Sequence, residues 1–133
     1  MIGLDSWIFL EFYMKGKKWL KCEQIVKSRN IKAISTVVLL EIKYKLTKAF
    51  GKVEARKVLH KIKVNKSVLI INVDEQVAEK AANLRLKYYK SKVRELSYAD
   101  CIHLATAITS KCEKFYSGDP DFKGIKEIPM EII

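Results

Sequence analysis

Apolar residues recur at two spacings along the chain, and their alternation predicts short strands separated by helices. Compact apolar runs that fit strands lie at residues 2–4, 31–34, 67–73 and 115–116, with a last one near 125–128. The run at 67–73 is expected to be a buried strand. Strands joined by one or two helices favour right-handed crossovers, and therefore a parallel sheet covered on both faces.

Helices are predicted between these runs, where apolar side chains recur at helical spacing. They are expected over residues 6–13, 18–28, 36–50, 53–62, 74–86 and 97–108. Ser6, Ser35, Asp74 and Ser97 stand where residues that cap helices are expected. With no repeat, linker or low-complexity segment, residues 1–133 are predicted to form a single three-layer α/β/α sandwich with a central, mainly parallel sheet.

Composition is consistent with a folded domain. Apolar residues make up 49% of the 133 residues, and no apolar run approaches the roughly 20 residues that span a bilayer. The N-terminus lacks the basic region and cleavage site of a signal peptide. Three cysteines without paired spacing indicate neither a disulfide framework nor a zinc site. We therefore expect a cytoplasmic protein that does not enter a membrane.

The chain is strongly basic, with 26 Lys and Arg against 15 Asp and Glu and a net charge of +11. One interpretation is a polyanionic partner, most simply nucleic acid. The other is a lysine-rich surface typical of proteins from hot environments. Charge alone leaves both interpretations open.

Several acids occupy unusual places in this pattern. Asp5 and Asp119 each follow a predicted strand, and Asp100 lies in the first turn of a helix that is apolar almost all round. A carboxylate in apolar surroundings is costly unless something compensates its charge. Taken singly, each acid has an ordinary explanation. Asp5, Asp119 and Asp121 fit turns, and Asp100 has capping-box spacing from Ser97.

Glu41 is unremarkable by itself, because an exposed helical acid four residues before Lys45 is common. Jointly, however, the carboxyl ends of parallel strands and the starts of the following helices meet at one sheet edge. Several carboxylates there cannot all stay ionised without a cation, and Mg²⁺ or Mn²⁺ suits such ligands. An acidic metal site in a basic protein fits hydrolysis of nucleic-acid phosphodiester bonds.

Four segments in order resemble the PIN-domain ribonucleases, and most closely the VapC-type toxins of prokaryotic toxin–antitoxin pairs. IGLDSWIFLEF resembles the first motif, with its acid at Asp5, and AISTVVLLEI resembles the second, with its acid at Glu41. LSYADCIHLATA is similar to the third motif and places Asp100. FYSGDPDF is similar to the fourth and places Asp119, with Asp121 as an accessory acid.

The resemblance implies a Mg²⁺- or Mn²⁺-dependent endoribonuclease in which Asp5, Glu41, Asp100 and Asp119 are catalytic. Asp5, Asp100 and Asp119 would hold the metal, and Glu41 would orient a water or a second metal. Ser6, Ser117 and Asp121 would support these acids. Trp7 departs from the small polar residue often found there in these toxins. The resemblance also implies a homodimer and inhibition by a small cognate antitoxin.

Lysines near the acids are predicted to bind the RNA backbone, and the set comprises Lys15, Lys17, Lys18, Lys43, Lys45 and Lys48. The main alternative role is that of a housekeeping PIN nuclease in RNA processing. Rival classes are a phospho-accepting receiver domain built on Asp74, a phosphatase and an inactive RNA-binding module. His60 is expected at the surface. His103 lies one turn after Asp100 and could approach the acids, but a partly buried core residue is expected rather than a ligand.

Overall fold

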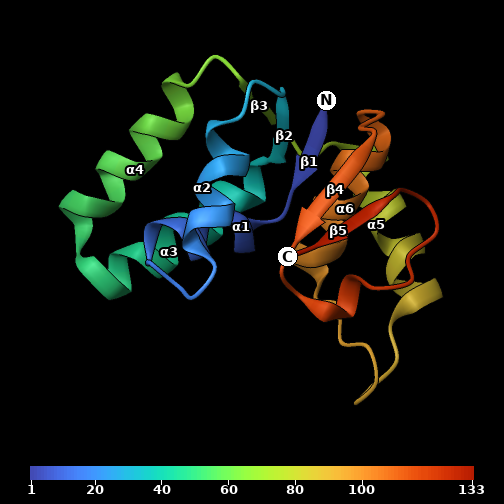
Figure 1. Ribbon diagram of the computed structural model, residues 1–133. Helices are drawn as coiled ribbons and strands as arrows, with labels where there is room; N and C mark the ends of the chain where they lie inside the picture. The colour runs from blue at the N-terminus through green and yellow to red at the C-terminus, as the bar shows by residue number, and fades with distance from the viewer.

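Five short strands form one parallel sheet at the centre of the molecule (Figure 1), in a computed structural model that describes residues 1–133. The strands are β1 (Ile2–Leu4), β2 (Lys32–Ser35), β3 (Val68–Ile71), β4 (Lys114–Ser117) and β5 (Met130–Ile132). Their order across the sheet is β3-β2-β1-β4-β5, and every neighbouring pair is parallel. All carboxyl ends therefore lie at one edge, with those of β1 and β4 side by side.

Helices cover both faces of the sheet, which confirms the predicted three-layer α/β/α architecture. Those on one face are α1 (Ser6–Tyr13), α2 (Trp19–Lys27), α3 (Thr36–Phe50) and α4 (Lys52–Val64). Those on the other face are α5 (Glu75–Tyr88) and α6 (Tyr98–Thr109). Figure 1 shows α3 and α4 projecting from the sheet as a pair, on the side away from α5 and α6. None of the helices combines the length and apolar character needed to span a membrane.

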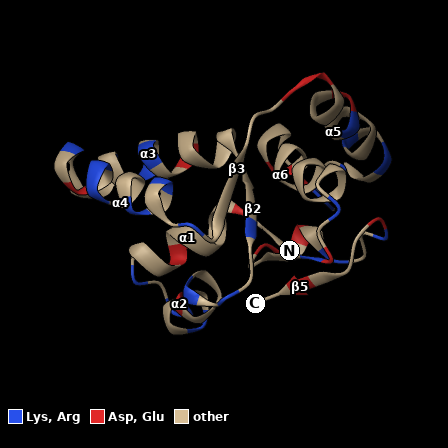
Figure 2. Cartoon of the chain, turned by 90° about the horizontal axis from the view of Figure 1, so that it is seen from above, with Lys and Arg blue, Asp and Glu red and all other residues tan.

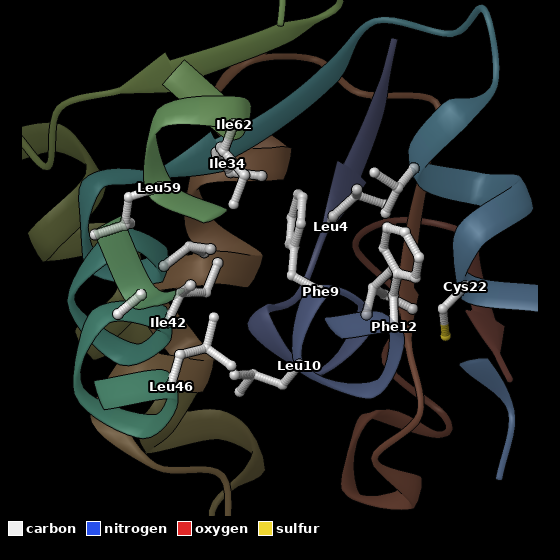
Figure 3. Packing of buried hydrophobic residues seen from close by; sticks show 14 of the residues in the cluster. Leu4, Phe9, Leu10, Phe12, Cys22, Ile34, Ile42, Leu46, Leu59 and Ile62 are labelled. Atoms are coloured by element: carbon white, nitrogen blue, oxygen red, sulfur yellow. The ribbon is translucent and has the colours of Figure 1, made fainter. Parts of the chain in front are cut away.

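Two apolar cores lie on the two faces of the sheet. Side chains alternate along each strand, so Ile2 and Leu4 face α1–α4 whereas Phe115 faces α5 and α6. Figure 3 shows the first core, where Phe9 and Leu10 of α1 lie between β1 and the α3–α4 pair. Because α1 begins directly after β1, this packing fixes the strand end that carries Asp5.

Gly3 allows β1 and α6 to approach each other closely. A Cβ atom on Gly3 would lie 2.5 Å from Cβ of Ala107, well inside van der Waals contact. The glycine faces α6 because its neighbours Ile2 and Leu4 face the opposite core. The close approach brings the α6 residues Asp100 and His103 near the end of β1.

The structure corrects three details of the sequence prediction. The last strand is Met130–Ile132 rather than 125–128; Ile125 and Ile128 are buried in a loop that reaches the core before Pro129. The predicted buried strand at 67–73 is the half-exposed edge strand β3, because only β2 pairs with it.

The third correction concerns helix caps. Asp5, not Ser6, occupies the N-cap position of α1, and neither Asp5 nor Ser35 caps its helix through the side chain. Asp74 does cap α5, by accepting from the backbone N–H of Val77. This use of Asp74 explains its position without a phospho-accepting role. His60 is exposed and His103 buried, as expected.

Candidate active site

Asp5, Ser117 and Asp119 meet where the adjacent strands β1 and β4 end. The backbone N–H of Asp5 donates to the carbonyl of Tyr116 over 3.0 Å, which holds Asp5 beside β4. The hydroxyl of Ser117 donates to Oδ2 of Asp5 over 2.7 Å and accepts from the backbone N–H of Asp119 over 3.0 Å. One buried hydroxyl therefore connects the two acids that the sequence placed at strand ends.

Asp100 reaches the same edge from the first turn of α6. Its Oδ2 accepts from the backbone N–H of Ser97, and the hydroxyl of Ser97 accepts from the backbone N–H of Asp100. This reciprocal pair is the capping box that its spacing allowed. The cap does not exclude a functional role, because Asp100 is also close enough to raise the pKa of Asp5.

Glu41 joins these acids through His103, a contact that the sequence prediction missed. Nε2 of His103 hydrogen-bonds to Oε1 of Glu41 and lies 4.0 Å from Oδ1 of Asp5. Nδ1 of His103 lies 3.1 Å from the hydroxyl of Ser35. The spacing of His103 one turn after Asp100 was a signal that it faces the site. We call the side chains of Asp5, Glu41, Asp100 and Asp119 the acidic site.

Burial makes the ionised form of two of these acids costly. Burial is the main cause that raises the pKa of Asp5 to about 6, and the nearby Asp100 and Glu41 raise it further. His103 and the hydroxyl of Ser117 act in the opposite direction. Burial also raises the pKa of Asp100, with Asp119 adding to the effect and the hydrogen bonds to Ser97 opposing it. The negative charges of these neighbouring acids therefore repel one another at this edge of the sheet.

Glu41 behaves differently, because its neighbours outweigh its burial. Burial alone would raise the pKa of Glu41, but His103, the hydroxyl of Ser6 and Lys45 hold it below its usual value. The expected surface pair with Lys45 is thus only a minor part of its environment. Glu41 is half-buried and held ionised beside the other acids.

The four acids do not form a complete set of metal ligands as they stand, and their arrangement suits a divalent cation that keeps part of its water shell. No three His, Cys, Asp or Glu side chains lie close enough to bind one metal ion as they stand. One oxygen each of Asp5, Asp100 and Asp119 is used by a hydrogen bond within the protein. Oδ1 of Asp5, in contrast, is the one buried side-chain oxygen or nitrogen without a hydrogen-bond partner. An unpaired buried carboxylate oxygen near other carboxylates suits a cation that keeps several waters, as Mg²⁺ does.

The supporting residues differ in what they contact. Ser6 lies beside Glu41, and Ser117 holds Asp5, so both hydroxyls serve the acidic site. Asp121 instead accepts from the backbone N–H of Glu95 over 3.3 Å, which attaches the loop between α5 and α6. Trp7 lies against Gly118, where an added Cβ would come within 2.3 Å of the indole ring. Trp7 therefore fills space beside the turn that carries Asp119.

Most of the candidate RNA-binding lysines are free of acidic partners. Lys15, Lys17, Lys43, Lys45 and Lys48 are all exposed, and none forms an ion pair. Figure 2 shows basic positions along α2, α3 and α4 as well as on α5. Lys18 differs, because its Nζ donates to the carbonyl of Ile133 over 2.8 Å.

Comparison with known proteins agrees with the fold and extends over nearly the whole chain. The family model described as PIN domain matches residues 2–128. No curated protein sequence gives a significant match.

Solved structures with the same fold include a toxin, a toxin–antitoxin complex and a VapBC complex. VapC20 from Mycobacterium tuberculosis, described as a sarcin–ricin loop cleaving toxin, has a TM-score of 0.77 at 20% identity, covering 97% of this chain and 99% of that one. A toxin–antitoxin complex from Klebsiella pneumoniae has a TM-score of 0.69 at 24% identity, covering 96% of this chain and 93% of that one. VapBC2 from Rickettsia felis, bound to a promoter DNA fragment, has a TM-score of 0.72 at 19% identity, covering 99% of this chain and 98% of that one.

Proposed function

The chain belongs to the PIN-domain family, and from this premise we propose that it is a metal-dependent endoribonuclease that hydrolyses RNA phosphodiester bonds. The observation that carries the proposal is the acidic site itself. Its four carboxylates come from α3, from α6 and from positions just after β1 and β4, and they gather at one sheet edge of a protein with net charge +11. A basic surface attracts the polyanion, and an acidic site within it binds the cation needed for phosphodiester hydrolysis.

Asp5, Asp100 and Asp119 would hold Mg²⁺ or Mn²⁺, directly or through water. When bound, the cation supplies a water activated for attack and stabilises negative charge on the phosphate. Oδ1 of Asp5 is buried without a hydrogen-bond partner, so it would be free to hold the cation. Ser117 fixes the other oxygen of Asp5, so the carboxylate keeps one orientation. Glu41, held ionised by His103, would accept a hydrogen bond from a water at the site.

The exposed lysines on α3 and in the turn after α1 would hold the RNA backbone. Lys43, Lys45 and Lys48 follow Glu41 on α3, and Lys15 and Lys17 lie in the turn after α1. With Lys18, they would place positive charge around the acidic site. Their ammonium groups would neutralise phosphates on either side of the cleaved bond.

The protein would act as the toxin of a cytoplasmic toxin–antitoxin pair, as a homodimer inhibited by a small antitoxin. Support comes from the similar structures, which include a protein described as a toxin, a complex described as toxin–antitoxin, and VapBC2 bound to promoter DNA. An acidic site without a cation also offers a docking place for an Arg or Lys side chain of a partner. A housekeeping nuclease is the alternative, and a small gene immediately beside this one would distinguish the toxin from it.

The partner proposal has a direct solution test. Light scattering on the isolated protein should give the mass of a dimer, and co-expression with the neighbouring gene should yield a stable complex without nuclease activity. A monomer at micromolar concentration that forms no such complex would leave the housekeeping nuclease as the role.

The nuclease proposal is tested by incubating purified protein with structured and unstructured RNAs, with and without Mg²⁺ or Mn²⁺. Cleavage should require the cation. Asp5→Asn and Asp100→Asn should each lower the rate by about 100-fold or more while the protein stays folded. Glu54→Gln on α4, which removes an exposed carboxylate, is the matched control and should cleave like the wild type. Wild-type cleavage by either Asn variant would contradict the assignment.

A further inference from the structure

His103 is buried at the point where three elements meet, and both of its ring nitrogens have partners. The side chain projects from α6, Glu41 lies on α3 and Ser35 ends β2. His103 is 2% exposed and Ser35 fully buried, so solvent satisfies neither group. Because a carboxylate can only accept, Nε2 of His103 donates to Glu41, and in the neutral ring Nδ1 accepts from the hydroxyl of Ser35.

The hydroxyl of Ser35 is used in an unusual way. Ser35 occupies the N-cap position of α3, where a serine hydroxyl normally accepts from the helix backbone, yet it makes no such bond. Its hydroxyl contacts Nδ1 of His103 instead, over 3.1 Å. The contact fixes one end of the ring and thereby aims Nε2 at Glu41 and toward Asp5.

Glu41 has no comparable restraint on its own helix. A glutamate has three side-chain torsions, and Lys45 one turn further along α3 would attract it away from the other acids. The hydrogen bond from His103 holds the carboxylate against this alternative. The ring also lies 4.0 Å from Oδ1 of Asp5, so it occupies a fixed place between two carboxylates of the acidic site.

We propose that His103, oriented by Ser35, is a positioning residue that holds the Glu41 carboxylate facing Asp5, so that the acidic site is formed before cation and RNA bind. This inference rests on the proposed function, in which Glu41 serves that site. Positioning groups that contact metal-site carboxylates typically contribute roughly 10- to 100-fold to metal affinity.

Two amide substitutions separate this role from simple packing. The amide nitrogen of Gln can reach the position of Nε2, whereas that of Asn reaches only the position of Nδ1. His103→Gln therefore keeps the donor from α6 for Glu41, whereas His103→Asn removes that donor and leaves only the hydroxyl of Ser6 beside Glu41. Both replacements are neutral amides that differ by one methylene group. His60→Gln, at an exposed position of α4, is the control for loss of a histidine.

The readout is Mn²⁺ binding to the full chain by calorimetry, after metal removal with EDTA, alongside thermal unfolding without metal. His103→Asn should bind Mn²⁺ roughly 10- to 100-fold more weakly than the wild type. His103→Gln should recover most of that loss, and His60→Gln should match the wild type. If His103→Asn does not fold, Ser35→Ala provides the same test, because it frees Nδ1 while keeping the ring.

A double-mutant cycle shows whether His103 acts through Glu41. In a Glu41→Gln background, His103→Asn should weaken Mn²⁺ binding no further, because the carboxylate that His103 positions is gone. Additive losses, or wild-type affinity in both His103→Asn and Ser35→Ala, would overturn the positioning role alone. A wild-type protein that neither binds Mn²⁺ nor cleaves RNA would instead overturn the proposed function, and this inference with it.

Discussion

Asp5 carries the largest electrostatic cost of the residues in the acidic site. Its carboxylate is buried, one oxygen has no partner, and its pKa rises from 3.8 to about 6. An acid whose pKa is raised in the folded state destabilises that state once it ionises. The contribution of Asp5 to the stability of the metal-free protein should therefore fall as the pH rises from about 4 to about 6, and a bound cation should restore it.

Asp5→Asn should stabilise the metal-free protein. The raised pKa of Asp5 corresponds to about 3 kcal/mol of unfolding free energy at neutral pH, which the neutral amide would recover while still accepting from Ser117. The gain should be complete above about pH 6 and absent below about pH 4. Urea unfolding in EDTA across this pH range measures it. An Asn variant less stable than the wild type at pH 7 would contradict the electrostatic account.

Adding Mn²⁺ provides the control for this prediction. Wild-type protein should gain stability with Mn²⁺ concentration, because a ligand that binds only the folded state stabilises it. Asp5→Asn should gain much less, since it lacks the unpaired carboxylate oxygen. Equal gains in both proteins would place the cation elsewhere.

At the scale of elements, the contact between β1 and α6 determines how the acids are spaced. Asp5 follows β1, whereas Asp100 and His103 lie on α6. The two elements approach closely because Gly3 faces Ala107 without a side chain. Any group that separates them would displace Asp5 from both α6 residues.

Gly3→Ala should destabilise the protein by about 1–3 kcal/mol, because its Cβ would overlap that of Ala107. RNA cleavage should fall as well, since the acidic site would widen. Urea unfolding of the single variants and of the double variant with Ala107→Gly measures the coupling. Gly3→Ala should cost less in the Ala107→Gly background. Fully additive changes in unfolding free energy would show that the contact between residues 3 and 107 does not determine how closely β1 and α6 pack.

At the scale of the whole molecule, charge separates into an acidic site and a basic surface. Most lysines and arginines lie on helices and loops around the sheet, as Figure 2 shows, and few of them pair with acids. In the proposed function, this arrangement would concentrate RNA at the surface without neutralising the acidic site.

Affinity for single-stranded RNA should fall steeply as salt rises, with each phosphate contact adding about 0.7 to the log–log slope. Lys43→Gln combined with Lys48→Gln on α3 should lower that slope by about 1.4. The control combines Lys66→Gln and Lys111→Gln, which precede β3 and β4 at the opposite sheet edge. Fluorescence anisotropy with a labelled RNA measures the salt dependence of affinity for the wild type and for both double variants. An affinity independent of salt, or equal effects of the two pairs, would exclude the predicted surface.

The sequence by itself determined the strand–helix alternation, the parallel sheet and the edge where Asp5 and Asp119 lie, because these follow from local periodicity and from the geometry of parallel strands. It also contained the Ser97–Asp100 capping box, whose partners are three residues apart. Glu41 was identified only through its resemblance to a family motif, since its local pattern is that of an exposed helical acid.

Only the tertiary structure decided what each acid contacts. Ser117 and Asp5 are 112 residues apart, His103 and Ser35 are 68 apart, and His103 and Glu41 are 62 apart. No local pattern encodes such pairs, because they depend on the close approach of β1, β2, α3 and α6. The position of the last strand depended on tertiary structure as well. Ile125 and Ile128 have the apolar character of strand residues, but they pack into the core from a loop. Met130–Ile132 pairs with β4 instead.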